Sequence, residues 1–159
     1  MPRNPLLTET TAENMLKILT GKDYEQAVKL HDWAEKEGLK IEPRTGALSY
    51  KIQYSTTKPK RSLFTIECNE KRWKVKANLY HFSQYSETES ISDAVKQAIT
   101  STRTCTGCNS RCIKGSRFHL DGKEYFTCIG SGHYFEGMGN PDWELLAQLL
   151  DHEKNIIAI

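Results

Sequence analysis

Four of the five cysteines in this 159-residue chain fall within one short stretch, and their spacing is the strongest chemical signal in the sequence. Cys105, Cys108 and Cys112 follow a C-x2-C-x3-C pattern, and Cys128 comes fifteen intervening residues later. A C-x2-C turn presents two thiolates to one metal ion, and four thiolates complete a tetrahedral zinc shell. Because four thiolates leave no coordination position for water, the zinc ion predicted at Cys105, Cys108, Cys112 and Cys128 is structural.

Whether Cys128 can join the other three depends on a hairpin predicted over residues 116–128. Asp121-Gly122 is a strong signal for a type I′ turn, and with this turn at the centre residue 128 falls opposite residue 115. Cys112 precedes Gly115 by three residues, a short length of chain. All four sulfur atoms are therefore expected to converge at the open end of this hairpin.

The same spacing fits other occupants, and these alternatives stay open. An iron–sulfur cluster, a redox-active dithiol or disulfide, and ordinary reduced thiols are each compatible with it. A long-range disulfide would most readily join Cys112 and Cys128. His133, in a glycine-rich stretch, could replace one thiolate, whereas His119 lies inside a predicted strand and is expected to face Glu124.

Alternating apolar and polar residues predict the strands. Residues 48–54 form one, and residues 62–68 and 71–79 form a hairpin that turns at Asn69-Glu70. This register places apolar side chains on one face and charged side chains on the other. Cys68 falls on the apolar face and is expected to be a small core residue. Substantial burial is predicted for Phe64, Trp73, Val75, Trp143 and Leu146.

Apolar residues at helical spacing predict four helices: residues 11–19, Asp23 to the glycine at position 38, residues 91–99 opened by Ser90, and a last helix starting at Asn140. The order of helices and hairpins lacks regular βα alternation. The predicted fold class is therefore α+β, an antiparallel sheet built from hairpins with helices packed on it. The expected organisation is an N-terminal helical arm (1–22) and a single α+β domain (23–159) that includes the cysteine hairpin 104–128.

Composition narrows the class of protein. Hydrophobic residues make up 38% and charged residues 26% of the chain, as in ordinary globular proteins. The sequence has no run of about 18 apolar residues, so no membrane-spanning helix and no membrane partner are expected. An odd number of cysteines and the lack of a secretory signal favour a reducing cytoplasm.

The net charge of +2 conceals a basic segment over residues 51–76, which has eight lysines and arginines against Glu67 and Glu70. Such a segment could face nucleic acid, but it is more often the solvated face of a sheet. The sequence shows no GxSxG or HExxH motif, so an enzyme is not favoured. The favoured function is a module that binds an unknown small molecule or protein, with a structural zinc site. The alternatives are a nucleic-acid-associated protein that uses residues 51–76, or a thiol-redox protein that acts through the cysteine loop.

Three motifs in the C-terminal half resemble a group of small uncharacterised bacterial proteins. These motifs are Cys105-Thr-Gly-Cys108-x3-Cys112, then Gly122-Lys123-x-Tyr125-Phe126-x-Cys128, then Asn140-Pro141-Asp142 at the start of a leucine-rich helix. The likeness covers residues 25–152 and is most specific from the cysteines to the last helix. It implies that the four cysteines act as a set, and it implies no particular activity.

Overall fold

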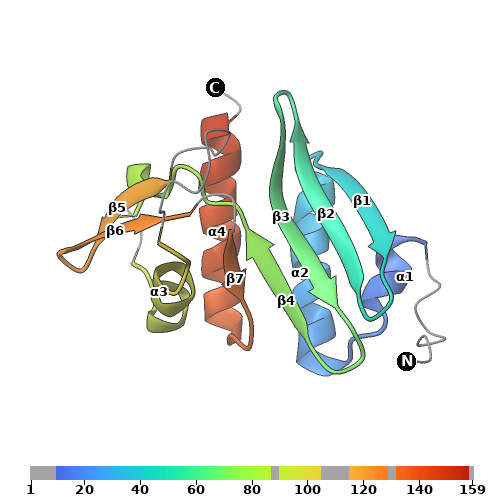
Figure 1. The fold of residues 1–159 in the computed structure, drawn as a ribbon. Helices are drawn as coiled ribbons and strands as arrows, with labels where there is room; N and C mark the ends of the chain where they lie inside the picture. The colour runs from blue at the N-terminus through green and yellow to red at the C-terminus, as the bar shows by residue number, and fades with distance from the viewer. Residues whose placement is uncertain (1–9, 87–89, 105–114, 129–131, 158–159) are drawn as a thin grey trace. The chain divides into compact units, whose positions relative to one another are not determined.

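The structure is a computed structural model that describes residues 10–86, 90–104, 115–128 and 132–157 (Figure 1). Its contacts divide the chain into two compact units, residues 1–76 and 77–159, and each is described by itself. Helices and antiparallel strands are both present, which confirms the α+β class. The predicted division of the chain at residue 22 stays a prediction.

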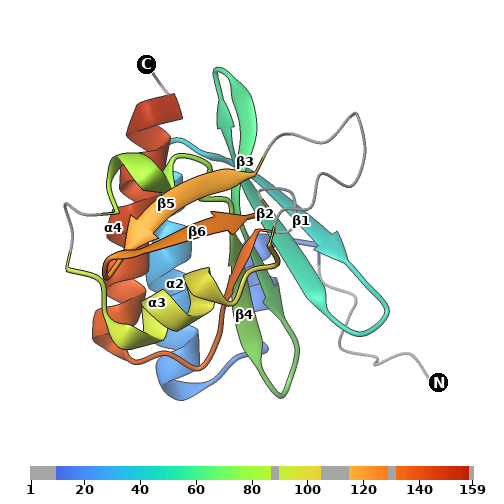
Figure 2. The same cartoon turned by 60° about the vertical axis from the view of Figure 1, so that its left-hand side comes forward.

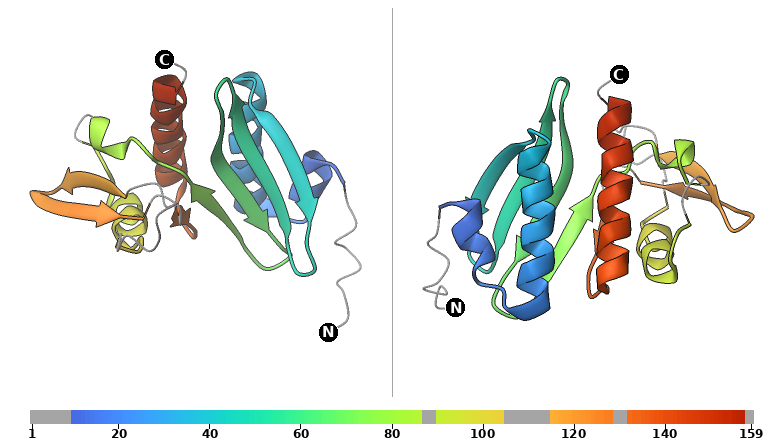
Figure 3. Two further views of the ribbon diagram at one scale, coloured as in Figure 1. Left: turned by 45° about the horizontal axis from the view of Figure 1, so that its top comes forward. Right: turned by 180° about the vertical axis from the view of Figure 1, so that it is seen from behind.

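Unit 1 contains two helices and four strands: α1 (Ala12–Leu16), α2 (Gly21–Lys36), β1 (Lys40–Thr45), β2 (Tyr50–Thr57), β3 (Lys60–Cys68) and β4 (Trp73–Ala77), whose last residue begins unit 2. The strands lie in the order β1-β2-β3-β4, and α1 and α2 cover one face of the sheet (Figures 1 and 3). Ile52 pairs with Ile66 and Tyr54 with Phe64. All four side chains are fully buried, as period-two alternation requires of an inner face.

The predicted core of this sheet is confirmed. Phe64 and Val75 are fully buried and Trp73 is 4% exposed. Cys68 is buried, with its Sγ 3.8 Å from the carbonyl oxygen of Met15 in α1. Burial raises the pKa of the Cys68 thiol to about 12, so this cysteine stays protonated at neutral pH and has little nucleophilic character.

Local details of unit 1 differ from the sequence predictions. Helix α2 begins at Gly21, two residues before Asp23, and its N-cap Thr20 makes no side-chain capping bond. The β3–β4 turn is at Glu70-Lys71, because the Asn69 amide donates to the Arg72 carbonyl at 3.0 Å. This turn lies one residue later than predicted, which shifts the partners by two positions and keeps each side chain on its face. Strand β1 was not predicted, since Pro43 and three charged residues hide its alternation.

Unit 2 contains η1 (Phe82–Gln84), α3 (Asp93–Thr100), β5 (Ser116–Leu120), β6 (Lys123–Thr127), β7 (His133–Phe135) and α4 (Asn140–Ile157). The β5–β6 hairpin and α3 lie on the same side of α4 (Figures 1 and 3). Trp143 and Leu146 of α4 are buried, as predicted. Helix α3 starts at Asp93 after the N-cap Ser92, so Ser90 is not its cap. The Ser92 hydroxyl instead donates to an Asp142 carboxylate oxygen at 2.5 Å.

The β5–β6 hairpin has the predicted turn and register. Leu120 pairs with Lys123, and the two turn residues Asp121 and Gly122 both have positive φ angles, 54° and 76°, as a type I′ turn requires. Glycine tolerates this conformation without strain, and aspartate is one of the side chains that adopts it most readily. The hairpin is visible beside α3 in Figure 2. Strand β7 was not predicted, because three residues in a glycine-rich stretch carry too little pattern.

Glu153 of α4 is a fully buried carboxylate that binds the residues on both sides of η1. It accepts hydrogen bonds from the His81 backbone amide at 2.5 Å and from the Tyr85 hydroxyl at 2.8 Å, and the His81 ring Nδ1 lies 3.1 Å away. Phe82 and Tyr85 are buried, so these two aromatic side chains belong to the core of unit 2. None of the described helices is long and apolar enough to cross a membrane.

Candidate functional site

Three of the four predicted metal ligands, Cys105, Cys108 and Cys112, lie in the range 105–114, outside the described residues. Cys128 is described: it is half-buried and forms no disulfide with a described residue. Its backbone amide donates to the Arg103 carbonyl at 2.7 Å. The zinc site predicted at these cysteines therefore stays a prediction. The structure describes the residues that flank it, called the cysteine frame below: Arg103, Thr104, Ser116, Thr127 and Cys128.

Thr127 pairs with the residues on both sides of the cysteine-bearing segment. Thr104, which directly precedes Cys105, forms an antiparallel bridge with Thr127. Ser116 pairs with the same Thr127 in the hairpin. The described residues on either side of this range, Thr104 and Ser116, thus both pair with the residue that precedes Cys128.

The two histidines considered as substitute ligands lie in different surroundings. His119 is exposed and pairs with Glu124, with 3.6 Å between Nε2 and Oε2, as expected from the sequence. His133 is 4% exposed, and its Nδ1 makes a short hydrogen bond with the hydroxyl of Thr102, two residues after the end of α3. Burial lowers the pKa of the His133 imidazole to about 4, so the ring is neutral at neutral pH.

The low pKa of His133 predicts that stability falls as the pH falls. The unfolded ring has a pKa near 6.5 and the folded ring near 4, so the unfolded chain takes up the proton first. The free energy of unfolding should decrease between these two pH values by about 3 kcal/mol. Urea denaturation at several pH values checks this. His133→Gln should lose this part of the slope and His119→Gln, at an exposed site, should keep it; equal slopes in both variants would contradict the prediction.

A groove in unit 2 is lined by residues of α3 and of the segment around β7. It has a volume of about 620 Å³ and lies between α3, the residues that follow it, and β7 with the loop beyond. The volume falls within the range of small-molecule sites. Its lining combines apolar and polar side chains, including Gln97, Ala98, Arg103, Tyr134, Glu136 and Met138. Tyr134 is 50% exposed, so its ring is open to solvent at the groove.

The basic residues of strands β2 to β4 carry the nucleic-acid alternative, which stays a prediction. Lys51 lies opposite Glu67 in the β2–β3 register, so one basic side chain of this segment faces an acidic one across the strands. The aromatic side chains of the same strands, Tyr54, Phe64 and Trp73, are buried. They cannot stack on bases, which single-strand binding surfaces commonly require.

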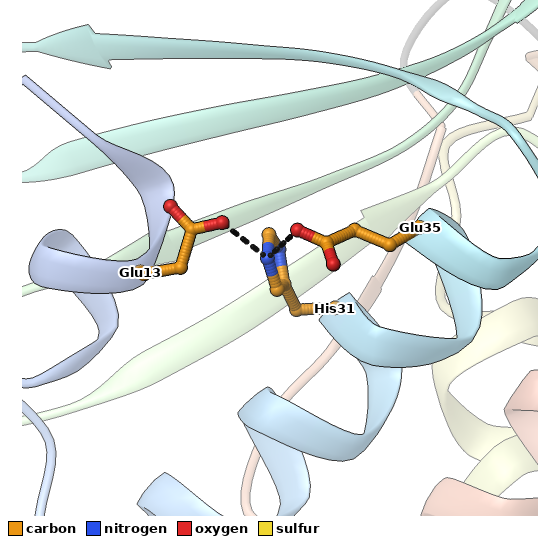
Figure 4. A group of neighbouring side chains, drawn as sticks. All are labelled: Glu13, His31 and Glu35. Carbon is orange, nitrogen blue, oxygen red and sulfur yellow. Dashed lines mark hydrogen bonds and ion pairs between the residues drawn. The ribbon is translucent and has the colours of Figure 1, made fainter.

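A second cluster, which the sequence interpretation did not identify, joins α1 to α2. Glu13 of α1 and Glu35 of α2 both approach Nε2 of His31, with Oε1 atoms at 3.3 and 3.0 Å (Figure 4). The other ring nitrogen, Nδ1, is hydrogen-bonded to the Tyr54 hydroxyl at 2.8 Å. One ligand atom from each of Glu13, His31 and Glu35 lies within 4.8 Å of the others, which makes this trio a candidate metal centre. The four-residue spacing of His31 and Glu35 is a usable sequence signal, whereas nothing local marks Glu13.

The electrostatics of this cluster follow from its surroundings. His31 has a side chain that is 3% exposed, while those of Glu13 and Glu35 are 59% and 50% exposed. A hydrogen bond with its own backbone amide lowers the pKa of the Glu13 carboxyl, with further lowering from Glu35 and His31. Burial raises the pKa of the Tyr54 hydroxyl, which is therefore neutral. The cluster thus presents an ionised carboxylate beside a buried imidazole.

Comparison with known proteins adds no relative from which a function could be transferred. No protein-family model, no curated protein and no solved structure matches this chain. The resemblance to small bacterial proteins with a cysteine cluster accordingly stays a prediction. Function must be inferred from the groove, the cysteine frame and the side-chain cluster themselves.

Proposed function

We propose that the protein is a small-ligand-binding module whose ligand occupies the groove between α3 and β7. The observation that carries this proposal is the groove itself, about 620 Å³ in volume. Methyl-bearing and aromatic side chains give the ligand an apolar contact surface, and Arg103, Glu136 and Gln97 supply polar partners. The ligand class that fits is a small organic molecule with an apolar body and polar groups at its edge.

The cysteine frame supports the groove in this proposal. Arg103, which lines the groove, is two residues from Cys105 and is hydrogen-bonded through its carbonyl to the amide of Cys128. A structural zinc ion held by Cys105, Cys108, Cys112 and Cys128 would fix this rim, because a closed four-thiolate shell orders the short segments that carry it. Zinc is the proposed occupant, and its role is to stabilise the binding surface.

The zinc part is tested by elemental analysis of the purified full chain together with a count of reactive thiols. We expect about one zinc per chain, lost in Cys112→Ser and retained in Cys68→Ala, because Cys68 is the cysteine outside the cluster. If the protein instead contains iron and absorbs visible light, the four cysteines hold an iron–sulfur cluster and not zinc. Metal-free, folded protein in which Cys105, Cys108, Cys112 and Cys128 react freely would overturn the zinc site.

The ligand part is tested with 1-anilinonaphthalene-8-sulfonate, a fluorescent probe that has an apolar ring system and one anionic group. We expect saturable binding near one probe per folded chain. Ala98→Trp, which fills the groove, should weaken binding at least about tenfold, a loss of about 1.4 kcal/mol. Asp93→Trp places the same bulk on α3 outside the groove lining and should leave binding unchanged. Equal binding by both variants would exclude the groove as the site.

A further inference from the structure

We propose that Glu13, His31 and Glu35 form a binding site for a divalent cation of the zinc class, separate from the cysteines. The three side chains would supply one imidazole nitrogen and two carboxylate oxygens. Zinc accepts both donor types, and sites with three protein ligands keep a fourth position for water. The cluster lies wholly within unit 1, so the proposal does not depend on the groove or on the cysteine segment.

The distances fit a tetrahedral shell. Zinc bonds of about 2.0–2.1 Å to nitrogen and oxygen place neighbouring ligand atoms about 3.3–3.4 Å apart. His31 Nε2 lies 3.3 Å from Glu13 Oε1 and 3.0 Å from Glu35 Oε1. The three side chains can thus surround one ion after small side-chain adjustments. Figure 4 shows Glu13 reaching from α1 and Glu35 from α2 toward the same edge of the imidazole ring.

The ring of His31 is oriented by a hydrogen bond at Nδ1, the nitrogen that faces away from the carboxylates, as in most protein metal sites. Its Nδ1 is 2.8 Å from the Tyr54 hydroxyl, and the Tyr54 ring stacks on Phe64 with 4.3 Å between centroids. A metal-bound histidine carries its remaining proton on the other nitrogen and donates it to a hydrogen-bond acceptor. The neutral, buried hydroxyl of Tyr54 is such an acceptor. When an ion is bound, this hydroxyl would accept the Nδ1 proton, which leaves the Nε2 lone pair facing Glu13 and Glu35.

The helices present these ligands without strain. His31 and Glu35 are four residues apart on α2, so they share one face of the helix. Glu13 stands in the first turn of α1, which is capped by the Thr11 hydroxyl. The exposed carboxylates leave the open side of the cluster accessible to a hydrated ion, while the burial of His31 shields the ligand nitrogen. A metal-free chain would instead hold a proton on Nε2 between the two carboxylates.

The experiment is a Zn²⁺ titration of the full chain, as purified, followed by the ring-nitrogen resonances of His31 in NMR spectra. Because the readout is the His31 ring, zinc bound to cysteines does not contribute to it. We expect Nε2 to change from a protonated to a metal-bound nitrogen as about one added equivalent binds. Unchanged His31 resonances at excess Zn²⁺ would overturn the proposal.

Matched variants separate ligation from structural ion pairing. Glu13→Gln and Glu35→Gln should each weaken Zn²⁺ binding at the His31 ring at least about tenfold, while Glu25→Gln, at an exposed position of α2, should not change it. Tyr54→Phe removes only the positioning hydroxyl and should weaken binding about 10- to 100-fold. If both glutamine variants bind Zn²⁺ as the unmodified chain does, the carboxylates are not ligands and the site is refuted.

Discussion

Replacing Glu153 by alanine is expected to lower the free energy of unfolding of unit 2 by about 3–5 kcal/mol, the range found when one partner of a buried polar pair is removed. The carboxylate is fully buried and accepts hydrogen bonds from the His81 amide and the Tyr85 hydroxyl. Without it the part-buried His81 amide and the buried Tyr85 hydroxyl both lose this acceptor, at a cost of about 1–3 kcal/mol for a buried group that finds no other. Burial also raises the pKa of Tyr85, so its hydroxyl cannot relieve the loss by ionising.

The measurement is amide hydrogen exchange along α4, because it reports the opening free energy of this unit separately. Gln148→Ala, at an exposed position of the same helix, is the control and should change stability by less than about 0.5 kcal/mol. Glu153→Gln keeps one acceptor oxygen, so its loss of stability should lie between those of Gln148→Ala and Glu153→Ala. A loss below about 1 kcal/mol in Glu153→Ala would mean that water or another acceptor replaces the carboxylate.

The hairpins were predictable because a single register satisfied two independent conditions. In residues 62–79, apolar side chains and charged side chains separate by parity, and only one pairing parity keeps Phe64 and Trp73 together inside. The turn itself was placed one residue early, and this error did not matter to the core. In the second hairpin Asp121-Gly122 fixed both the turn and the register. Strand β1 was not predicted, because this edge strand contains Pro43 and its apolar and polar residues hardly alternate.

The cysteine pattern could be recognised from the sequence alone, whereas the His31 cluster could not. Cysteine spacing is a local signal, so the sequence could nominate Cys105, Cys108, Cys112 and Cys128 before any fold was known. The cluster around His31 forms only because α1 packs beside α2. This packing brings Glu13 to His31, which lies eighteen positions later in the chain. Nothing in the residues near Glu13 indicates this approach. The same holds for Glu153, whose partners lie about seventy positions earlier.

The apolar-face register of the first hairpin leads to the most direct test of the sequence interpretation. Phe64→Ala is expected to lower the free energy of unfolding of unit 1 by about 3–5 kcal/mol, because it removes a large buried ring and leaves a cavity. Phe64 is fully buried, stacks on Tyr54 with the ring planes 6° apart, and contacts the Trp33 ring at a centroid distance of 6.2 Å. Aromatic pairing adds about 0.5–1.5 kcal/mol to the loss expected from burial alone.

The neighbouring residue supplies the matched control. Thr65 pairs with Gln53 on the opposite face of the same strand and is half-buried, so Thr65→Ala should cost less than about 1 kcal/mol. Amide hydrogen exchange of β2 and β3 measures both variants. A large loss in both would mean that both faces of the sheet are packed equally, and the two-faced register would be wrong. A large loss in Phe64→Ala alone follows from the alternation between Phe64 and Cys68, where buried and half-buried side chains take turns along the strand.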